Sequence, residues 1–350
     1  MVASPKMSVT QHDYERYAAG MVQHTPGATP QFDSHTALGH LHSTCLDDTG
    51  ITIRRWRQDD ARRVRDLLDT DTDTLWIEQF HALHGPDQDG PDWRRTLVAV
   101  DSYNRLLGCA SIAVNTLHSS RFPCAIDVHP RFRRRGLGAA LLDAIKQARP
   151  DDLPLSTKVR TANTAAMGFL TKAGAATYAR CLNVVIDPND PAVMRWASRR
   201  HKAGSHSMNL QDKDPESLSK VFERQYMWIH QRWSPVGDLD LLTEVAAAEI
   251  NAIDANASSG VWHDGEIVAV AFAFPVPNEP VLEIVAETTT ERQPWGTEFL
   301  AEAVAATLRV TRRRNCLLRF DGHMSDPHLH PVLSALPWLR RDPLDLVEIP

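Results

Sequence analysis

The chain has 350 residues, a net charge of −6 and a pI near 6.2. Its content of 43% hydrophobic and 23% charged residues is ordinary for a soluble globular protein, and its length predicts two domains. The acidic balance argues against a nucleic-acid partner, and no apolar run is long enough to cross a bilayer. Since the first residues also lack the apolar core of a secretion signal, we expect no membrane partner and a cytoplasmic location.

Residues 1–48 are polar and show no sustained periodicity, which predicts an N-terminal extension rather than part of a packed domain. The five cysteines are widely scattered and lack Cys-x-x-Cys spacing. Dispersed histidines such as His323, His328 and His330 have no ligand cluster beside them in the sequence. We therefore expect neither a disulfide framework nor a metal site.

The first predicted elements follow this extension. Residues 51–54 alternate like a strand, and apolar residues from position 61 onward then recur at helical spacing. Strand-like runs at 96–100 and 106–114 are joined by a turn-rich junction, which predicts a hairpin. Another strand covers 124–128 and stops at Pro130, because proline cannot continue a sheet ladder.

The segment between the predicted helix and the hairpin is markedly acidic and also carries Trp76, Phe80 and Trp93. An acidic lid there would attract a cationic substrate, whereas a solvated loop would explain the same composition. The aromatic residues could line a pocket or form local core. The acidic residues are Asp69, Asp71, Asp73, Glu78, Asp87, Asp89 and Asp92.

A basic, glycine-containing turn follows the strand that ends at Val128. Residues 133–138 read Arg-Arg-Arg-Gly-Leu-Gly, and apolar residues then recur at helical spacing up to Ala148. Backbone N–H groups from Arg134 to Ala139 would lie at the start of this helix, where they have no internal partner and can bind a phosphate. The motifs of P-loop kinases and of dinucleotide-binding dehydrogenases are absent. No aromatic residue lies between Arg133, Arg134 and Arg135 to stack nucleic-acid bases.

This turn, together with Val128 before it, resembles the Arg/Gln-x-x-Gly-x-Gly/Ala signature of the GNAT superfamily of N-acetyltransferases. Downstream of a predicted strand at 154–160, Asn163, Ala166 and Gly174 fall on the marked positions of a second family motif. The resemblance covers about residues 50–186. It implies an α/β (α+β) fold with a mixed, mostly antiparallel twisted sheet flanked by helices, and acetyl-CoA as the co-substrate.

The resemblance also implies roles for individual residues. The Val128 backbone N–H would polarise the acetyl carbonyl, and Asp127 is the nearest candidate for a general base, although a strand-end carboxylate is more often a cap or ion-pair partner. Leu170 occupies the position at which many family members carry a tyrosine that protonates the departing thiolate. The expected cofactor-binding residues are Val128, Arg133, Arg134, Arg135, Gly136, Leu137, Gly138, Ala139, Asn163 and Phe169.

The second half of the chain repeats the same order of predicted elements, after a linker at 188–207. The turn that corresponds to residues 133–138 is Gln293–Glu298, which keeps only the glutamine and the first glycine of the signature. There, Pro294 removes a backbone donor and Glu298 would repel phosphate. We therefore predict a tandem chain, with an extension (1–48), a GNAT domain (49–187), a linker (188–207) and a degenerate GNAT-like domain (208–350).

The predicted activity is transfer of an acetyl group from acetyl-CoA to a primary amine of a small molecule or peptide, by direct attack without a covalent enzyme intermediate. The alternative is a non-catalytic sensor or interaction protein that binds acyl-CoA. The degenerate domain could complete the acceptor pocket, bury a sheet face or mediate homodimerisation. The sequence leaves the amine and the length of the acyl group open.

Overall fold

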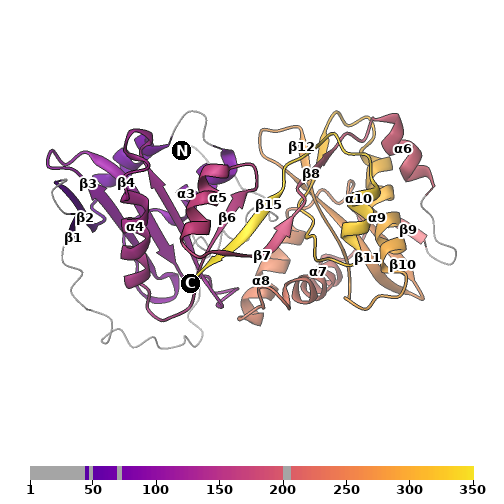
Figure 1. The fold of residues 1–350 in the computed structure, drawn as a ribbon. Coiled ribbons are helices and arrows are strands. Elements are labelled where there is room, and N and C mark those ends of the chain that lie inside the picture. The colour runs from indigo at the N-terminus through magenta and orange to yellow at the C-terminus, as the bar shows by residue number, and fades with distance from the viewer. Residues whose placement is uncertain (1–43, 47–49, 69–72, 200–205) are drawn as a thin grey trace, which may run out of the picture. The chain divides into compact units, whose positions relative to one another are not determined.

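The computed structural model describes residues 44–46, 50–68, 73–199 and 206–350 (Figure 1). The predicted extension at 1–48 therefore lies almost wholly outside the described residues. The chain forms two compact units that interleave along the sequence. One unit runs up to Val159 and includes Ala165–Ala176 and Val347–Pro350, and the other holds Arg160–Thr164 and Thr177–Leu346. No helix in the described ranges has the length and apolar character needed to span a membrane.

The first sheet has the strand order β1-β2-β3-β4-β5-β6-β15-β7. Neighbouring strands from β1 to β5 are antiparallel, whereas β5 and β6 are parallel. The predicted hairpin is confirmed as β3 and β4. The strands are β1 (Thr44–Leu46), β2 (Ile51–Arg55), β3 (Arg94–Val100), β4 (Leu106–Ala113), β5 (Phe122–Val128), β6 (Leu155–Arg160), β7 (Ala176–Cys181) and β15 (Leu344–Ile349).

Helices cover both faces of this sheet. Because side chains alternate along a strand, Leu97 and Val98 of β3 point to opposite faces. Leu97 belongs to a core cluster with Leu141, whereas Val98 belongs to one with Phe80. The α-helices of this part are α2 (Asp60–Arg63), α3 (Thr74–Leu83), α4 (Leu137–Gln147) and α5 (Thr164–Lys172), and the 3-10 helices are η1 (Val64–Leu67), η2 (Gly90–Asp92) and η3 (Pro130–Phe132).

Helix α3 lies within the acidic segment and was not predicted as a helix. Asp73 caps its start, since the Leu75 N–H donates to the Asp73 carboxylate at 3.1 Å. Phe80 and Leu83 are buried, so the solvated-loop hypothesis is wrong for these residues. Tertiary burial of one apolar face stabilises a helix here despite the acidic composition.

The second sheet has the strand order β14-β8-β13-β12-β11-β10-β9. Only β12 and β13 are parallel among its described pairs, so the mixed, mostly antiparallel pattern predicted for both halves is confirmed. The strands are β8 (Val184–Ile186), β9 (His206–Asn209), β10 (Ser259–His263), β11 (Glu266–Pro275), β12 (Val281–Thr288), β13 (Leu317–Phe320) and β14 (Arg340–Arg341). The helices are α6 (Pro191–Ser198), α7 (Pro215–His230), α8 (Leu239–Ile250), α9 (Gly296–Thr311) and α10 (Leu329–Ala335).

Helix α6 corrects part of the predicted linker at 188–207. Its Val193 and Trp196 are buried in the same core cluster as residues of α9. In the sequence, the Asp-Pro pair at positions 190 and 191 indicates a linker. In the structure, Asp190 caps the helix and Pro191 occupies its first turn. Residues 200–205 of that linker lie outside the described residues.

Candidate active site

The parallel strands β5 and β6 remain paired over a short distance only. Their register covers Phe122 with Leu155 and Pro123 with Ser156, and it extends no further along the described strands. Beyond that point, the side chain of Gln79 in α3 forms hydrogen bonds with polar groups of β6. Its amide donates to Thr157 Oγ1 at 2.8 Å and accepts from the Lys158 N–H at 3.1 Å. The last part of β5 is therefore left without a strand neighbour on its β6 side.

The predicted phosphate-binding turn has the backbone geometry of an anion site. Arg134 and Gly136 both lie in the left-handed region, with φ of 65° and 82°. The N–H groups of residues 134–139 have no hydrogen-bond acceptor in the part of the chain that the structure describes. The first backbone bond of α4 runs from the Ala140 N–H to the Gly136 carbonyl, at 3.0 Å. A run of unbonded N–H groups at a helix N-terminus attracts a phosphate.

The three arginines of the turn differ in their surroundings. Arg133 folds back onto β5, where its Nε donates to the Val128 carbonyl at 2.8 Å and its Nη2 lies 3.3 Å from Asp127 Oδ1. Arg135 stacks over the Phe132 ring, with its guanidinium carbon 5.6 Å from the ring centroid. Arg134 is exposed. Arg133 therefore fixes the turn, while Arg134 and Arg135 remain at the surface, where a phosphate can reach them.

Helix α5 contacts the start of α4 at the second glycine of the turn. A Cβ atom added to Gly138 would lie 3.5 Å from the Phe169 ring and 3.8 Å from Val128. The structure thus brings Val128, Gly138 and Phe169 together, and their roles in binding the cofactor stay predictions. Asn163 is exposed and directly precedes α5, and its cofactor role stays a prediction. Leu170 is buried in the core and carries no ionisable group.

The two catalytic candidates are hydrogen-bonded to each other. Asp127 is only 7% exposed, and its Oδ1 accepts from the Val128 N–H at 2.7 Å. Its Oδ2 accepts from Trp76 Nε1 of α3 at 2.9 Å. Burial raises the pKa of Asp127, although the hydrogen bonds from Trp76 and Val128 and the nearby Arg133 oppose that rise. A buried carboxyl with a raised pKa is better suited to accept a proton than an exposed aspartate is.

Trp76 is a site residue that sequence reasoning did not assign. The sequence left it open between pocket and core, and no local pattern links it to Asp127, which lies 51 positions away. Trp76 and Gln79 are three residues apart in α3, so they lie on the same face of the helix. This face connects the end of β5 with β6.

Asp87 and Asp89 of the proposed lid bind neighbouring groups of the same domain. Asp87 accepts from the Thr96 N–H at 3.1 Å and lies 3.8 Å from Arg55. Asp89 forms an ion pair with Arg95. These pairings reduce the negative charge available to attract a cation. Asp69 and Asp71, which belong to the same hypothesis, lie outside the described residues.

The corresponding turn of the second sheet is filled by a side chain. A Cβ atom added to Gly296 would lie 2.5 Å from the His328 ring, which therefore covers this glycine. His328 is held in place by Thr288, the last residue of β12, because His328 Nδ1 lies 2.9 Å from Thr288 Oγ1. The Gly296 N–H is also used, since it donates to the Gln293 carbonyl at 3.0 Å. Together with Pro294 and Glu298, this arrangement supports the prediction of a degenerate turn.

Comparison with known proteins places the first half in a defined class. Residues 53–175 match the profile of the Acetyltransferase (GNAT) family. This stretch contains the diverging strands β5 and β6, the turn at residues 133–138 and α5. Residues 53–175 therefore form a GNAT acetyltransferase domain. A comparison with curated protein sequences found no match.

Solved structures extend the likeness to most of the chain. A GCN5-related N-acetyltransferase from Sphaerobacter thermophilus is 12% identical, with a TM-score of 0.54 over 87% of this chain and 96% of that one. A tandem GNAT protein from the clavulanic acid biosynthesis pathway is 15% identical, with a TM-score of 0.52 over 85% and 98%. A glucosamine N-acetyltransferase region of a fungal multi-domain protein gives 11% identity and a TM-score of 0.56, over 85% of this chain and 38% of that one. The chain thus has a tandem GNAT fold.

Proposed function

We propose that the turn at residues 133–138 binds the pyrophosphate of acetyl-CoA and that the chain transfers the acetyl group to a primary amine. The observation that carries this proposal is the run of unbonded N–H groups at residues 134–139, beside the point where β5 loses its β6 neighbour. Diphosphate needs several donors in a concave arrangement, and a helix N-terminus with two left-handed residues supplies them. The family match of residues 53–175 supports the same assignment.

In the proposed mechanism, acetyl-CoA displaces an internal hydrogen bond. The Val128 N–H donates to Asp127 Oδ1 at 2.7 Å. When the acetyl carbonyl oxygen takes this N–H, it becomes polarised towards attack, and Asp127 Oδ1 is released to accept a proton from the incoming ammonium or amine. Trp76 keeps the carboxylate in position through Oδ2. The two catalytic groups would therefore become active together, only after the cofactor binds.

The departing coenzyme A leaves without a tyrosine acid in this proposal. Leu170 stands where the family tyrosine is expected, and its side chain is buried. A thiol has a pKa of about 8.5, so the thiolate can leave as an anion or take a proton from water. Because the acidic residues Asp87 and Asp89 are paired with arginines, we propose only a primary amine of a small molecule or peptide as the acceptor.

The test is calorimetric titration of the purified chain with acetyl-CoA, followed by an assay of coenzyme A release with a panel of amines. We expect Gly136→Glu to weaken acetyl-CoA binding at least tenfold, because a carboxylate would enter the phosphate site. Gly50→Glu is the matched control. Gly50 also has a positive φ and open space around its Cβ position, but it lies in the turn before β2.

Two outcomes would count against the proposal. If the wild-type chain does not bind acetyl-CoA at micromolar concentration, the cofactor assignment fails. If Gly136→Glu binds as tightly as Gly50→Glu, the site lies elsewhere. Tight binding without turnover across the panel would favour the alternative of a non-catalytic acyl-CoA sensor, for which the buried Leu170 is the supporting observation.

A further inference from the structure

A second group of chemically reactive side chains lies where residues 180–183 run beside residues 321–324. Backbone bonds join the two segments: the Leu182 N–H donates to the Gly322 carbonyl and the Met324 N–H to the Arg180 carbonyl, each at 2.8 Å. Cys181 and His323 face each other directly as an antiparallel bridge pair. Directly paired residues hold their Cβ atoms about 5 Å apart, so the backbone itself brings these two side chains together.

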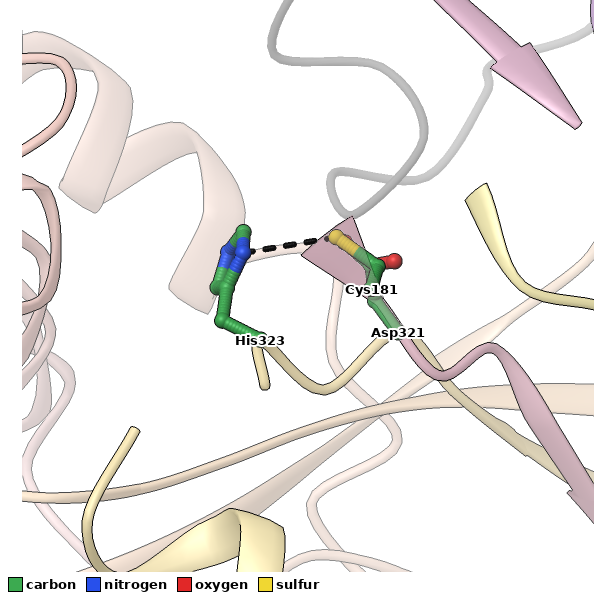
Figure 2. Close-up of side chains that lie close together, drawn as sticks. All are labelled: Cys181, Asp321 and His323. Carbon is green, nitrogen blue, oxygen red and sulfur yellow. Dashed lines mark hydrogen bonds between the residues drawn. The ribbon is translucent and has the colours of Figure 1, made fainter. Parts of the chain in front are cut away.

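Three potential metal ligands meet at this position (Figure 2). One ligand atom each of Cys181, Asp321 and His323 lies within 4.8 Å of the other two. Cys181 Sγ is 3.3 Å from His323 Nδ1. Sulfur and nitrogen ligands of a tetrahedral Zn²⁺ ion are separated by about 3.6 Å, given bond lengths of about 2.3 and 2.0–2.1 Å. The sulfur and imidazole are therefore close to the separation that a shared metal ion requires.

The backbone between the two ligands of the second segment depends on glycine. Gly322 separates Asp321 from His323 and has a φ of 64°. A Cβ atom there would overlap Leu333 Cδ1, so a side chain is excluded by both conformation and space. The Asp-Gly-His sequence thus fixes how the carboxylate and the imidazole are presented.

The surroundings favour a cation. Cys181 is buried, whereas Asp321 and His323 are half-buried, so an ion could reach the group from solvent. The Trp233 ring packs against the His323 ring with centroids 4.6 Å apart, which restricts the orientation of the imidazole. Asp321 adds a carboxylate oxygen to the group, and carboxylates bind divalent cations.

We propose that Cys181, Asp321 and His323 bind one divalent transition-metal ion, with Zn²⁺ as the ion that best suits a thiolate, an imidazole and a carboxylate. Cys181 binds as the thiolate and releases its proton to solvent. Three protein ligands leave a fourth position for water or a small-molecule ligand. This site is separate from the proposed acetyl-CoA turn, and it revises the expectation that the chain holds no metal.

The test is metal binding to the full chain after treatment with a chelator and dialysis. We expect titration with Zn²⁺ to give one ion per chain. Titration with Co²⁺ should give the ultraviolet absorption of a cobalt–thiolate bond. Cys181→Ser should remove that absorption and, like His323→Ala, should weaken Zn²⁺ binding at least tenfold. Cys316→Ser, at a half-buried cysteine elsewhere in the same unit, should leave both properties unchanged.

The proposal is overturned if the chelator-treated wild-type chain takes up no stoichiometric Zn²⁺ or Co²⁺. It is also overturned if Cys181→Ser and His323→Ala bind Zn²⁺ as tightly as Cys316→Ser does. Far-ultraviolet circular dichroism checks that each variant is folded. Asp321→Asn, which preserves the shape of the side chain while removing its charge, provides the same comparison if Cys181→Ser fails to fold.

Discussion

Replacement of Gly136 by alanine separates the conformational role of this residue from its role in binding. Gly136 precedes α4 with a φ of 82°, and a Cβ atom added there meets no atom within 4 Å. The substitution therefore creates no clash within the chain. Its effect on stability should come from the left-handed backbone alone, and its effect on binding from a methyl group that points to where the phosphates should lie.

The size of the stability effect follows from this geometry. A non-glycine residue in the left-handed conformation costs about 1–2 kcal/mol. For a folding unit of about 150–250 residues, each kcal/mol lowers Tm by about 2–4 °C. We therefore expect Gly136→Ala to lower the Tm of its unit by about 2–8 °C. Acetyl-CoA binding should weaken in addition, because the methyl group limits how closely a phosphate can approach the N–H groups.

The measurements are calorimetric unfolding and titration with acetyl-CoA, with Gly50→Ala as the control. Gly50 has a φ of 65° and the same open surroundings, so Gly50→Ala should lower Tm by a similar amount. It should not change acetyl-CoA binding. The reasoning is refuted if Gly136→Ala leaves Tm unchanged, or if both variants change acetyl-CoA affinity equally.

Four further variants test the two proposed sites and the packing around them. Asp127→Asn should lower kcat by about 10²- to 10⁴-fold if Asp127 is the base, whereas Trp76→Phe should lower it less; equal losses would point to a purely structural carboxylate. Burial lowers the pKa of His84 to about 3 in the folded chain, whereas an exposed histidine has a pKa of about 6.5. Below about pH 6.5 the unfolded chain therefore binds a proton at His84 that the folded chain does not bind. The free energy of unfolding then falls by about 1.4 kcal/mol per pH unit. In denaturant unfolding between pH 6.5 and 4, the stability of His84→Leu should depend less on pH than that of the wild type. An unchanged pH dependence would contradict the lowered pKa of His84. Gly322→Ala should destabilise its unit by about 2–5 kcal/mol, which is the sum of left-handed backbone strain and a close contact with Leu333. A variant with the Tm of the wild type would contradict this estimate.

Local patterns in the sequence were sufficient to predict the turn at residues 133–138 and the helix that follows it. The glycine at position 136, the arginines before it and the apolar spacing after it all lie within one strand–turn–helix unit. The physics of helix N-termini acts over these few residues. Strands β2 to β5 were predicted for the same reason, because alternation and turn residues are local signals, whereas β1, β9, β14 and β15 were not predicted.

Helices α3 and α6 show where local signals failed. Acidic and proline-rich stretches were interpreted as a loop and a linker, yet in each helix an aspartate caps the start and one face is buried in a core. Burial depends on elements that are distant in the chain, such as α9 for Trp196. Composition could not show that these faces would be covered.

The sequence by itself determined the class of fold and the position of the glycine-containing turn at residues 133–138, since both follow from short-range patterns. Only the tertiary structure decided the partners of the chemically active groups. Asp127 meets Trp76 across 51 positions, and Cys181 meets His323 across 142. These contacts depend on which strands pair and which helix packs against them. Such long-range pairing is set by burial of the whole sheet, so no local motif records it.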